Sequence, residues 1–232
     1  MSVYLQPNGP VAKRALLPGD PKRAMELANL LLEKPLMSNL SRGLWGYHGA
    51  TSAGEKLTVQ ATGIGAPSAT IVRHEMAALG LDRAIRVGTC VALEGGPPPG
   101  TFVLGAKALE STGPRAADGA DVSLTAALKA LLGGDTPSLA VAPMERYYDA
   151  AAVARRATWT EAGATIADLC TGALLEAGAE LGVGVASALV VAEDAAGKRL
   201  PDERLESRLM ELGQIAAEAL IASGEESPAS AS

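Results

Sequence analysis

The amino-acid sequence predicts a single α/β domain built around a largely buried sheet. Short apolar runs alternate with amphipathic helical stretches across short turns, which is the pattern that packs helices against a sheet. The 232 residues are 48% hydrophobic but only 3% aromatic, so we expect one core filled by aliphatic side chains. No internal repeat and no interdomain linker divides the chain.

Six apolar runs are expected to form the strands of this sheet. They cover residues 13–17, 57–61, 84–87, 101–105, 138–142 and 183–192. Each run is bounded by glycine, proline or polar residues, and the last run is the longest. Two segments between them are expected to lie on the surface, a turn over residues 95–100 and a polar loop over residues 111–122.

Five stretches are expected to form helices, over residues 22–33, 68–79, 124–132, 168–181 and 202–222. Before the first of these, Asp20 suits the N-cap and Pro21 suits the first helical position. The last helix carries an apolar stripe at helical spacing, formed by Leu205, Leu209, Leu212, Ala216 and Leu220. We expect the domain to span residues 1–222 and residues 223–232 to form a disordered tail.

The bulk properties exclude several classes of protein. The net charge is −6 and the basic residues form no run, which argues against nucleic-acid and membrane partners. The sequence has no signal-peptide pattern and no apolar stretch of the roughly 18 residues needed to cross a bilayer. Cys90 and Cys170 match neither a disulfide framework nor a zinc spacing. We therefore expect a cytoplasmic protein without a metal.

Three turns share one design, in which a strand end is followed by glycine and then by a polar group or a helix start. They are Gly19-Asp20, the segment from Gly63 to Ser68, and Gly88-Thr89. Such turns collect at the carboxyl edge of a sheet, where α/β proteins bind ligands. A helix N-terminus in such a turn favours an anion.

Three arginines lie close to these turns in sequence, namely Arg23, Arg42 and Arg86. Arg86 stands out because it interrupts the apolar run from Ala84 to Val87, where a buried charge must have a partner. Two interpretations stay open at this point. Arg86 either belongs to a structural ion pair or helps to bind an anion.

Other common catalytic signatures are missing from the sequence. The pair Gly63 and Gly65 lacks the third glycine of the dinucleotide fingerprint. Neither a P-loop nor a serine-hydrolase elbow occurs. The two histidines, His48 and His74, stand in no nucleophile motif, so we expect them to be incidental.

Taken in order, three motifs resemble the bacterial nucleoside phosphorylases, a family that includes small-subunit purine nucleoside phosphorylases, uridine phosphorylase and methylthioadenosine nucleosidases. The motifs are Leu17–Arg23, Thr62–Ser68 and Ile85–Cys90, and the resemblance extends over residues 13–222. It implies a central mixed, twisted sheet flanked by helices, in a homo-oligomer built from dimers that can reach a hexamer.

The resemblance also implies a phosphate site and no cofactor besides inorganic phosphate as co-substrate. Its residues would be Gly19, Arg23, Arg86 and Thr89, with Arg42 contributed by the neighbouring subunit. Three guanidinium groups can offset the charge of a desolvated dianion and orient its oxygens. Phosphate held there would stabilise an oxocarbenium-like transition state, which gives Arg86 a catalytic role.

The base side matches the family in part. The segment Met144–Asp149 resembles the Gln-Glu-Arg-Tyr-Asp segment with which uridine phosphorylase reads uracil, and this favours a uridine phosphorylase-like enzyme. Arg146 is retained, but Met144 replaces the glutamine and cannot make paired amide hydrogen bonds. The alternative is that this segment is only a solvated helix start.

The ribose side departs furthest from the family pattern of Glu-Met-Glu. The matching residues are Asp168, Leu169 and Cys170, so Leu169 can still pack on the sugar while Cys170 cannot replace a carboxylate. Val91 stands where the family has glycine and would crowd the pocket. Glu193 falls at the position of the acid that protonates the leaving base, with Asp194 beside it as an alternative.

These observations leave three hypotheses for function. The first is a nucleoside phosphorylase with an altered sugar or base preference. The second is a nucleosidase, against which the retained arginines argue because water needs no anion clamp. The third is a catalytically weak relative that binds a nucleoside or phosphate. In each case we expect Cys90 and Cys170 to line or closely flank the pocket, where their oxidation could modulate it.

Overall fold

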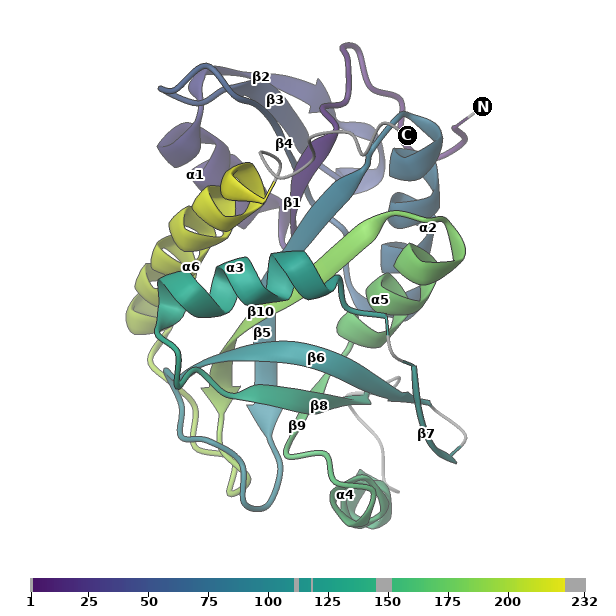
Figure 1. The fold of residues 1–232 in the computed structure, drawn as a ribbon, viewed down its shortest axis with the longest axis vertical. Helices are drawn as coiled ribbons and strands as arrows, with labels where there is room; N and C mark the ends of the chain where they lie inside the picture. The colour runs from purple at the N-terminus through teal and green to yellow at the C-terminus, as the bar shows by residue number, and fades with distance from the viewer. Residues whose placement is uncertain (1, 111–112, 118, 145–151, 224–232) are drawn as a thin grey trace, which may run out of the picture.

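A twisted mixed sheet of ten strands runs through the centre of the molecule (Figure 1). The structure is a computed structural model that describes residues 2–110, 113–117, 119–144 and 152–223. The strands are β1 (Arg14–Pro18), β2 (Glu33–Asn39), β3 (Gly46–Ala50), β4 (Lys56–Gln60), β5 (Arg83–Ala92), β6 (Phe102–Glu110), β7 (Gly113–Ala117), β8 (Ser138–Pro143), β9 (Ile166–Asp168) and β10 (Gly184–Glu193).

The described helices are α1 (Pro21–Leu31), α2 (Gly65–Ala78), α3 (Val122–Leu132), α4 (Ala152–Glu161), α5 (Thr171–Glu180) and α6 (Asp202–Ala222), with a short 3-10 turn η1 (Ser41–Gly43). The N-cap predicted for α1 is confirmed, because the Asp20 side chain accepts a hydrogen bond from the amide of Arg23. None of these helices, over the part of the chain that is described, is long and apolar enough to cross a membrane.

The strand order is β10-β6-β8-β9-β5-β1-β4-β3-β2, with β7 attached to β6. Strands β4, β1, β5 and β10 run parallel, whereas β2 and β3 form an antiparallel edge. Strand β10 also pairs with β5, so β5, β10, β6, β8 and β9 close into a ring. The sheet is therefore mixed, as predicted, and half of its strands curl into a barrel-like unit.

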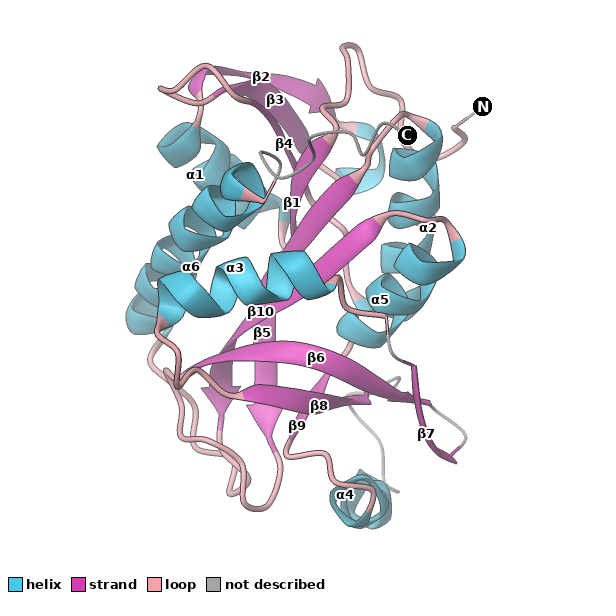
Figure 2. Cartoon of the chain, viewed as in Figure 1, coloured by secondary structure: helices cyan, strands magenta, loops and turns pink. Residues whose placement is uncertain are grey.

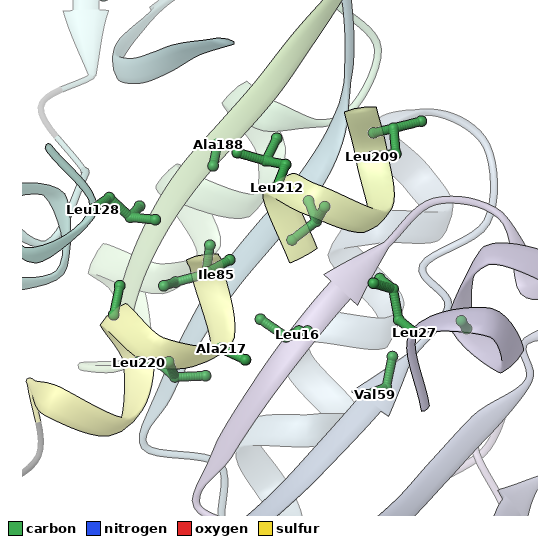
Figure 3. Packing of buried hydrophobic residues seen from close by; sticks show 14 of the residues in the cluster. Leu16, Leu27, Val59, Ile85, Leu128, Ala188, Leu209, Leu212, Ala217 and Leu220 are labelled. Atoms are coloured by element: carbon green, nitrogen blue, oxygen red, sulfur yellow. The ribbon is translucent and has the colours of Figure 1, made fainter. Parts of the chain in front are cut away.

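Two helical layers cover the sheet (Figure 2). Helices α1, α3 and α6 pack on one face, where leucines such as Leu27, Leu128 and Leu209 surround Ile85 of the central strand (Figure 3). Helices α2 and α5 cover the other face through Val72 and Leu174. The core is almost entirely aliphatic, as the composition predicts.

The predicted strands and helices all have counterparts, but five further elements escaped prediction. These are β2, β3, β7, β9 and α4. The polar loop expected over residues 111–122 is wrong in part, because residues 113–117 pair with β6 as β7. The helix expected from residue 168 starts at Thr171, because Asp168 ends a short strand. Of the predicted tail only Ser223 is described, and its amide bonds back to α6.

Candidate active site

The strand register brings the three glycine turns together at the carboxyl edge of the sheet, as predicted. Pro18 is paired with Val87, so Gly19 follows beside Gly88 on the neighbouring strand. The amide of Gly63 donates to the carbonyl of Gly19 at 3.1 Å, which joins the second turn to the first. Gly63 has a φ of +74°, a left-handed conformation that favours glycine.

Gly19 itself is not required by the packing of the chain. A Cβ placed there would approach only the carbonyl oxygen of Gly63, at 3.6 Å, which is an ordinary contact. Nearby, the guanidinium group of Arg23 pairs with Glu206 of α6 at 3.2 Å. The Arg23 Nε is buried and has no hydrogen-bond partner within the described residues. The turn thus has free space next to the Gly19 backbone, and the nearby Arg23 keeps one nitrogen without a hydrogen-bond partner.

Arg86 lies in a buried ion pair with Asp168. Its Nε and Nη2 donate to the two carboxylate oxygens, each at 2.9 Å, and both side chains are about 95% buried, with 5% and 4% exposed. Burial alone would lower the pKa of Arg86, but the charge and hydrogen bonds of Asp168, together with the nearby Cys170 and Cys90, raise it. Gly88 leaves room for this pair, because a Cβ there would lie 2.7 Å from the Arg86 guanidinium carbon.

The structural interpretation of Arg86 is therefore observed, and one nitrogen is left over. Nη1 is buried and has no hydrogen-bond partner among the described residues. Asp168 is the partner that the sequence did not reveal. Its oxygens also accept the amides of Cys170 and Thr171 and the Thr171 hydroxyl, so the carboxylate caps the start of α5.

A pocket of about 120 Å³ opens next to this ion pair. It is lined by Thr89, Cys90, Val91, Met144, Ala167, Asp168, Leu169, Ala192, Glu193 and Arg199. Four of the predicted site residues are thus brought together, namely Thr89, Met144, Leu169 and Glu193. Val91, which is expected to crowd the pocket, is one of its lining residues.

Glu193 and Asp194 differ sharply in what they do. A register shift after Val191 pairs Glu193 with Val91 and brings it to the pocket. The Asp194 carboxylate instead accepts the amides of Ala196 and Lys198 and shapes the following loop. That loop returns Arg199 to the pocket, 3.8 Å from the Glu193 carboxylate. Arg199 belongs to no sequence motif, and it reaches the pocket only because the loop after Glu193 folds back.

The sequence predicts that both cysteines line or closely flank the pocket. Cys90 lines it, whereas Cys170 is not a lining residue and follows the lining residues Asp168 and Leu169 in sequence. Burial raises the pKa of both thiols, so each is neutral at physiological pH, and both are unpaired with any other cysteine. Neither thiol is a reactive thiolate in this environment.

Predicted site residues that do not line this pocket are Gly19, Arg23, Arg42, Arg86 and Cys170. Arg42 is exposed on η1, in a left-handed conformation with φ +58°, and its guanidinium group stacks on the Tyr4 ring at 4.8 Å. Arg146 lies outside the described residues. Over the described ranges, no three His, Cys, Asp or Glu side chains gather in a way that could hold a metal ion.

Comparison with known proteins places this geometry in a family. Residues 13–223 match the model of the phosphorylase superfamily. The chain is 44% identical over 96 residues to the DeoD-type purine nucleoside phosphorylase of Oceanobacillus iheyensis, a match that covers 40% of each chain. A second DeoD-type purine nucleoside phosphorylase, from Clostridium beijerinckii, is 45% identical over 92 residues, or 38% of that relative.

The fold is shared over a longer span. Uridine phosphorylase from Vibrio fischeri ES114 superposes with a TM-score of 0.79 over 91% of this chain and 93% of that one, at 21% sequence identity. The aligned segments span only about 40% of the curated purine phosphorylases, whereas the family model covers almost the whole described chain. This protein belongs to the phosphorylase superfamily.

Proposed function

We propose that the chain is a nucleoside phosphorylase, which uses phosphate to split a nucleoside into free base and (deoxy)ribose 1-phosphate. The observation that carries this proposal is the junction of two features at Thr89. Thr89 directly follows Gly88 at the edge where the glycine turns meet, and it also lines the pocket. An anion bound at the edge would therefore face whatever the pocket holds.

The proposed phosphate site consists of Gly19, Arg23, Arg86 and Thr89. Gly19 has room for a Cβ, so its lack of one suits a ligand that approaches the backbone closely. Arg23 and Arg86 each keep a buried nitrogen without a hydrogen-bond partner in the described structure. An oxyanion would supply the acceptor that these nitrogens lack.

In the proposed reaction, a phosphate oxygen forms a bond to the anomeric carbon while the glycosidic bond to the base breaks. The bonding electrons leave with the base, and Glu193 transfers a proton to it. Leu169 and Cys170 would lie on the sugar side, and Met144 and Arg146 on the base side. Met144 is buried at the pocket and carries no amide, so it provides no group that selects uracil over a purine.

We further propose a cytoplasmic homo-oligomer based on a dimer, in which each site takes Arg42 from the neighbouring subunit and no metal or organic cofactor. The support is that Arg42 is exposed and points to Tyr4 and not to the pocket of its own chain. The two free cysteines fit a reducing compartment.

The test is release of free base from a panel of purine and pyrimidine nucleosides, with and without phosphate, in wild type and Thr89→Val. We expect release that requires phosphate. In Thr89→Val, loss of a hydrogen bond to a charged ligand should raise the KM for phosphate about 10-fold or more. The KM for the nucleoside should change far less.

Thr158→Val is the matched control, because the Thr158 hydroxyl bonds only to the Ala154 carbonyl on an exposed helix face. This variant should behave like wild type. Base release that is independent of phosphate would replace the proposal with a nucleosidase. No release from any nucleoside would refute the phosphorylase and favour the catalytically weak relative.

A further inference from the structure

The proposed phosphate site, on which this inference rests, takes an arginine from a loop with an unusual backbone, the η1 loop over residues 40–44. Arg42 has φ +58° and the next residue, Gly43, has φ +71°, so two successive residues are left-handed. Glycine adopts this conformation readily, whereas a residue with a side chain rarely does. A strained residue persists only where surrounding contacts hold it in place, and such residues gather at functional sites.

The charge of Arg42 is not used to hold this conformation. Over the described ranges no carboxylate pairs with Arg42, and its guanidinium group lies over the Tyr4 ring at 4.8 Å. Leu40, at the start of the η1 loop, and Ile64, in the second glycine turn, are exposed by 65% and 86%. Exposed apolar side chains beside an unpaired cation fit a surface that a second copy of the chain covers.

Two buried amide side chains, which we call the amide clamp, hold the end of the η1 loop. Asn39 and Gln60 are each 2% exposed, and both donate to the carbonyl oxygen of Leu44, Gln60 at 2.9 Å. A carbonyl oxygen has two lone pairs, so the clamp satisfies this acceptor completely. Gln60 also donates to the carbonyl of Ala61 at 2.9 Å, which fixes its own orientation.

The surrounding chain is built to fit the amide clamp. Gly46 is paired with Asn39 on one side and with Gln60 on the other, and a Cβ there would lie 2.2 Å from the Gln60 Oε1. The Asn39 Oδ1 accepts the amide of Gln6 at 2.9 Å, while its nitrogen donates to Leu44. Neither amide can therefore turn without losing a buried hydrogen bond.

The amide clamp also joins the η1 loop to the chain's own glycine turns. Gln60 ends β4, and the amide of Ala61 donates to the carbonyl of Trp45 at 2.9 Å. The Leu44 side chain packs beside Gly63, 3.1 Å from the place where a Cβ would stand. The loop that presents Arg42 is thus tied to the edge where the glycine turns meet.

We infer that Asn39 and Gln60 are positioning residues for Arg42. By holding the Leu44 carbonyl they fix the left-handed turn, and the turn aims the guanidinium group at the phosphate bound by the neighbouring subunit. Neither amide touches the phosphate. Their effect belongs to the neighbour's site and not to the pocket of their own chain. A misplacement of about 1 Å can cost about 100-fold in such a site.

Isothermal titration calorimetry with inorganic phosphate tests this inference in the intact protein. Gln60→Met keeps the length of the side chain but removes the donor to Leu44. We expect its Kd for phosphate to rise about 10-fold or more, toward that of Arg42→Ala, because the charge is present but no longer aimed. The KM for the nucleoside should change far less. Unchanged phosphate binding in a folded Gln60→Met variant would overturn the inference.

Thr58→Val is the matched control on the same strand. Thr58 is 1% exposed, and its hydroxyl accepts the amide of Ala12 at 2.9 Å, so this variant also removes a buried polar group from β4. It leaves the hydrogen bonds of the η1 loop intact and should bind phosphate like wild type. A loss equal to that of Gln60→Met would mean that any buried defect in β4 weakens the site, which would also overturn the inference.

Mixed oligomers, assayed at phosphate concentrations below the wild-type KM, show on which subunit Gln60 acts. In a mixed dimer of Gln60→Met and Glu193→Gln chains, one site combines an intact pocket with a correctly held Arg42. Co-expression in equal amounts should therefore add about one quarter of wild-type activity to that of the single variants, because about half of the dimers are mixed.

Co-expression of Gln60→Met with Arg42→Ala should add nothing, because both sites of that mixed dimer lack a well-placed arginine. The reverse pattern, with activity regained beside Arg42→Ala and not beside Glu193→Gln, would show that Gln60 serves the pocket of its own chain. That result would replace the inference with a structural role for Gln60.

The outcome for the amide clamp can be separated from the outcome for the reaction. A wild type that neither binds phosphate nor requires it for base release would refute the phosphorylase, and the inference with it. Phosphate-dependent release with normal phosphate binding in Gln60→Met would refute only the clamp. If Gln60→Met does not fold, Asn39→Asp takes its place, because it removes the other donor to Leu44 and keeps the acceptor for the Gln6 amide.

Discussion

At the scale of single residues, two buried arginines differ in their partners and in the direction of their pKa shifts. Arg86 has a bidentate carboxylate partner, and its pKa is raised. Arg73 on α2 is completely buried, but within the described residues its guanidinium group donates a hydrogen bond only to the carbonyl of Val183, at 3.2 Å. Burial lowers the pKa of Arg73 to about 10. A carboxylate partner decides whether a buried guanidinium group stabilises the fold.

Asp168→Asn should destabilise the protein by about 3–5 kcal/mol, because it leaves the Arg86 charge buried without a counter-charge. Urea denaturation followed by circular dichroism measures this change. Asp194→Asn is the control, since that carboxylate accepts only amides of a surface loop, and it should cost about 1 kcal/mol or less. Equal losses in the two variants would contradict the importance of the ion pair.

Arg73→Met should stabilise the protein by about 1–2 kcal/mol, measured by the same denaturation. The lowered pKa corresponds to a cost on the order of 3 kcal/mol for keeping Arg73 charged near neutral pH. Part of the gain is lost because the Val183 carbonyl loses its donor. The cost is present below the folded pKa and disappears as the pH rises past it, so the benefit applies at pH 7. A destabilised variant would imply that Arg73 has a stronger partner.

At the scale of elements, short sequence patterns correctly predicted the helices and strands whose positions depend on nearby residues. The Asp20-Pro21 start and the apolar runs identified α1 and the central strands, because capping and patterning act within a few residues. Strand β2 escaped because it contains Pro35, which is tolerated only at a sheet edge, and the edge position is set by β3. Strand β9 has three residues and no period that could be recognised.

The same limit applies to the candidate site. The order of motifs sufficed to predict that the glycine turns meet and that Thr89, Leu169 and Glu193 approach one pocket. It could not predict that Asp168 pairs with Arg86, which lies 82 residues away along the chain. Arg199 escaped for a related reason, because a turn shaped by Asp194 brings it back.

The N-terminal segment depends on one side chain of α2, and this gives a pH-dependent prediction. Glu75 accepts the amides of Val3, Tyr4 and Leu5 at 2.6–3.0 Å. Burial would raise the pKa of Glu75, but these hydrogen bonds outweigh it and lower the pKa. A lowered pKa contributes stability above the unfolded value, about 4.3, that is lost as the pH falls through the folded value.

Glu75→Gln should therefore melt about 2–4 °C below wild type at pH 7, and this gap should close below about pH 4. Thermal unfolding at a series of pH values measures it. The exposed Glu218 on α6 provides the control, and Glu218→Gln should show no such gap at any pH. A gap for Glu75→Gln that persists in acid would exclude the carboxylate as its source.

At the scale of the whole molecule, the exposed Arg42 makes the proposed assembly testable by complementation. Arg42→Ala and Glu193→Gln should each reduce turnover about 100-fold or more when purified alone. Chains co-expressed in equal amounts should regain about one quarter of wild-type activity, because half of the dimers are mixed and each of these has one intact site.

The double variant Arg42→Ala/Glu193→Gln mixed with wild type is the matched control for this design. It produces mixed dimers in which each site carries one substitution, so it should show no more activity than the wild-type dimers it contains. Native mass spectrometry would confirm that mixed oligomers form. Mixed oligomers without regained activity would mean that Arg42 serves no site across an interface.

The ring of strands has a consequence for how the molecule opens. Strands β5 and β10 are hydrogen-bonded to each other. Strand β5 also pairs with β1 and β9, and strand β10 also pairs with β6. Neither strand can detach by fraying from an edge, whereas β2 can. The backbone amides behind the pocket should thus exchange with solvent only when the domain unfolds globally.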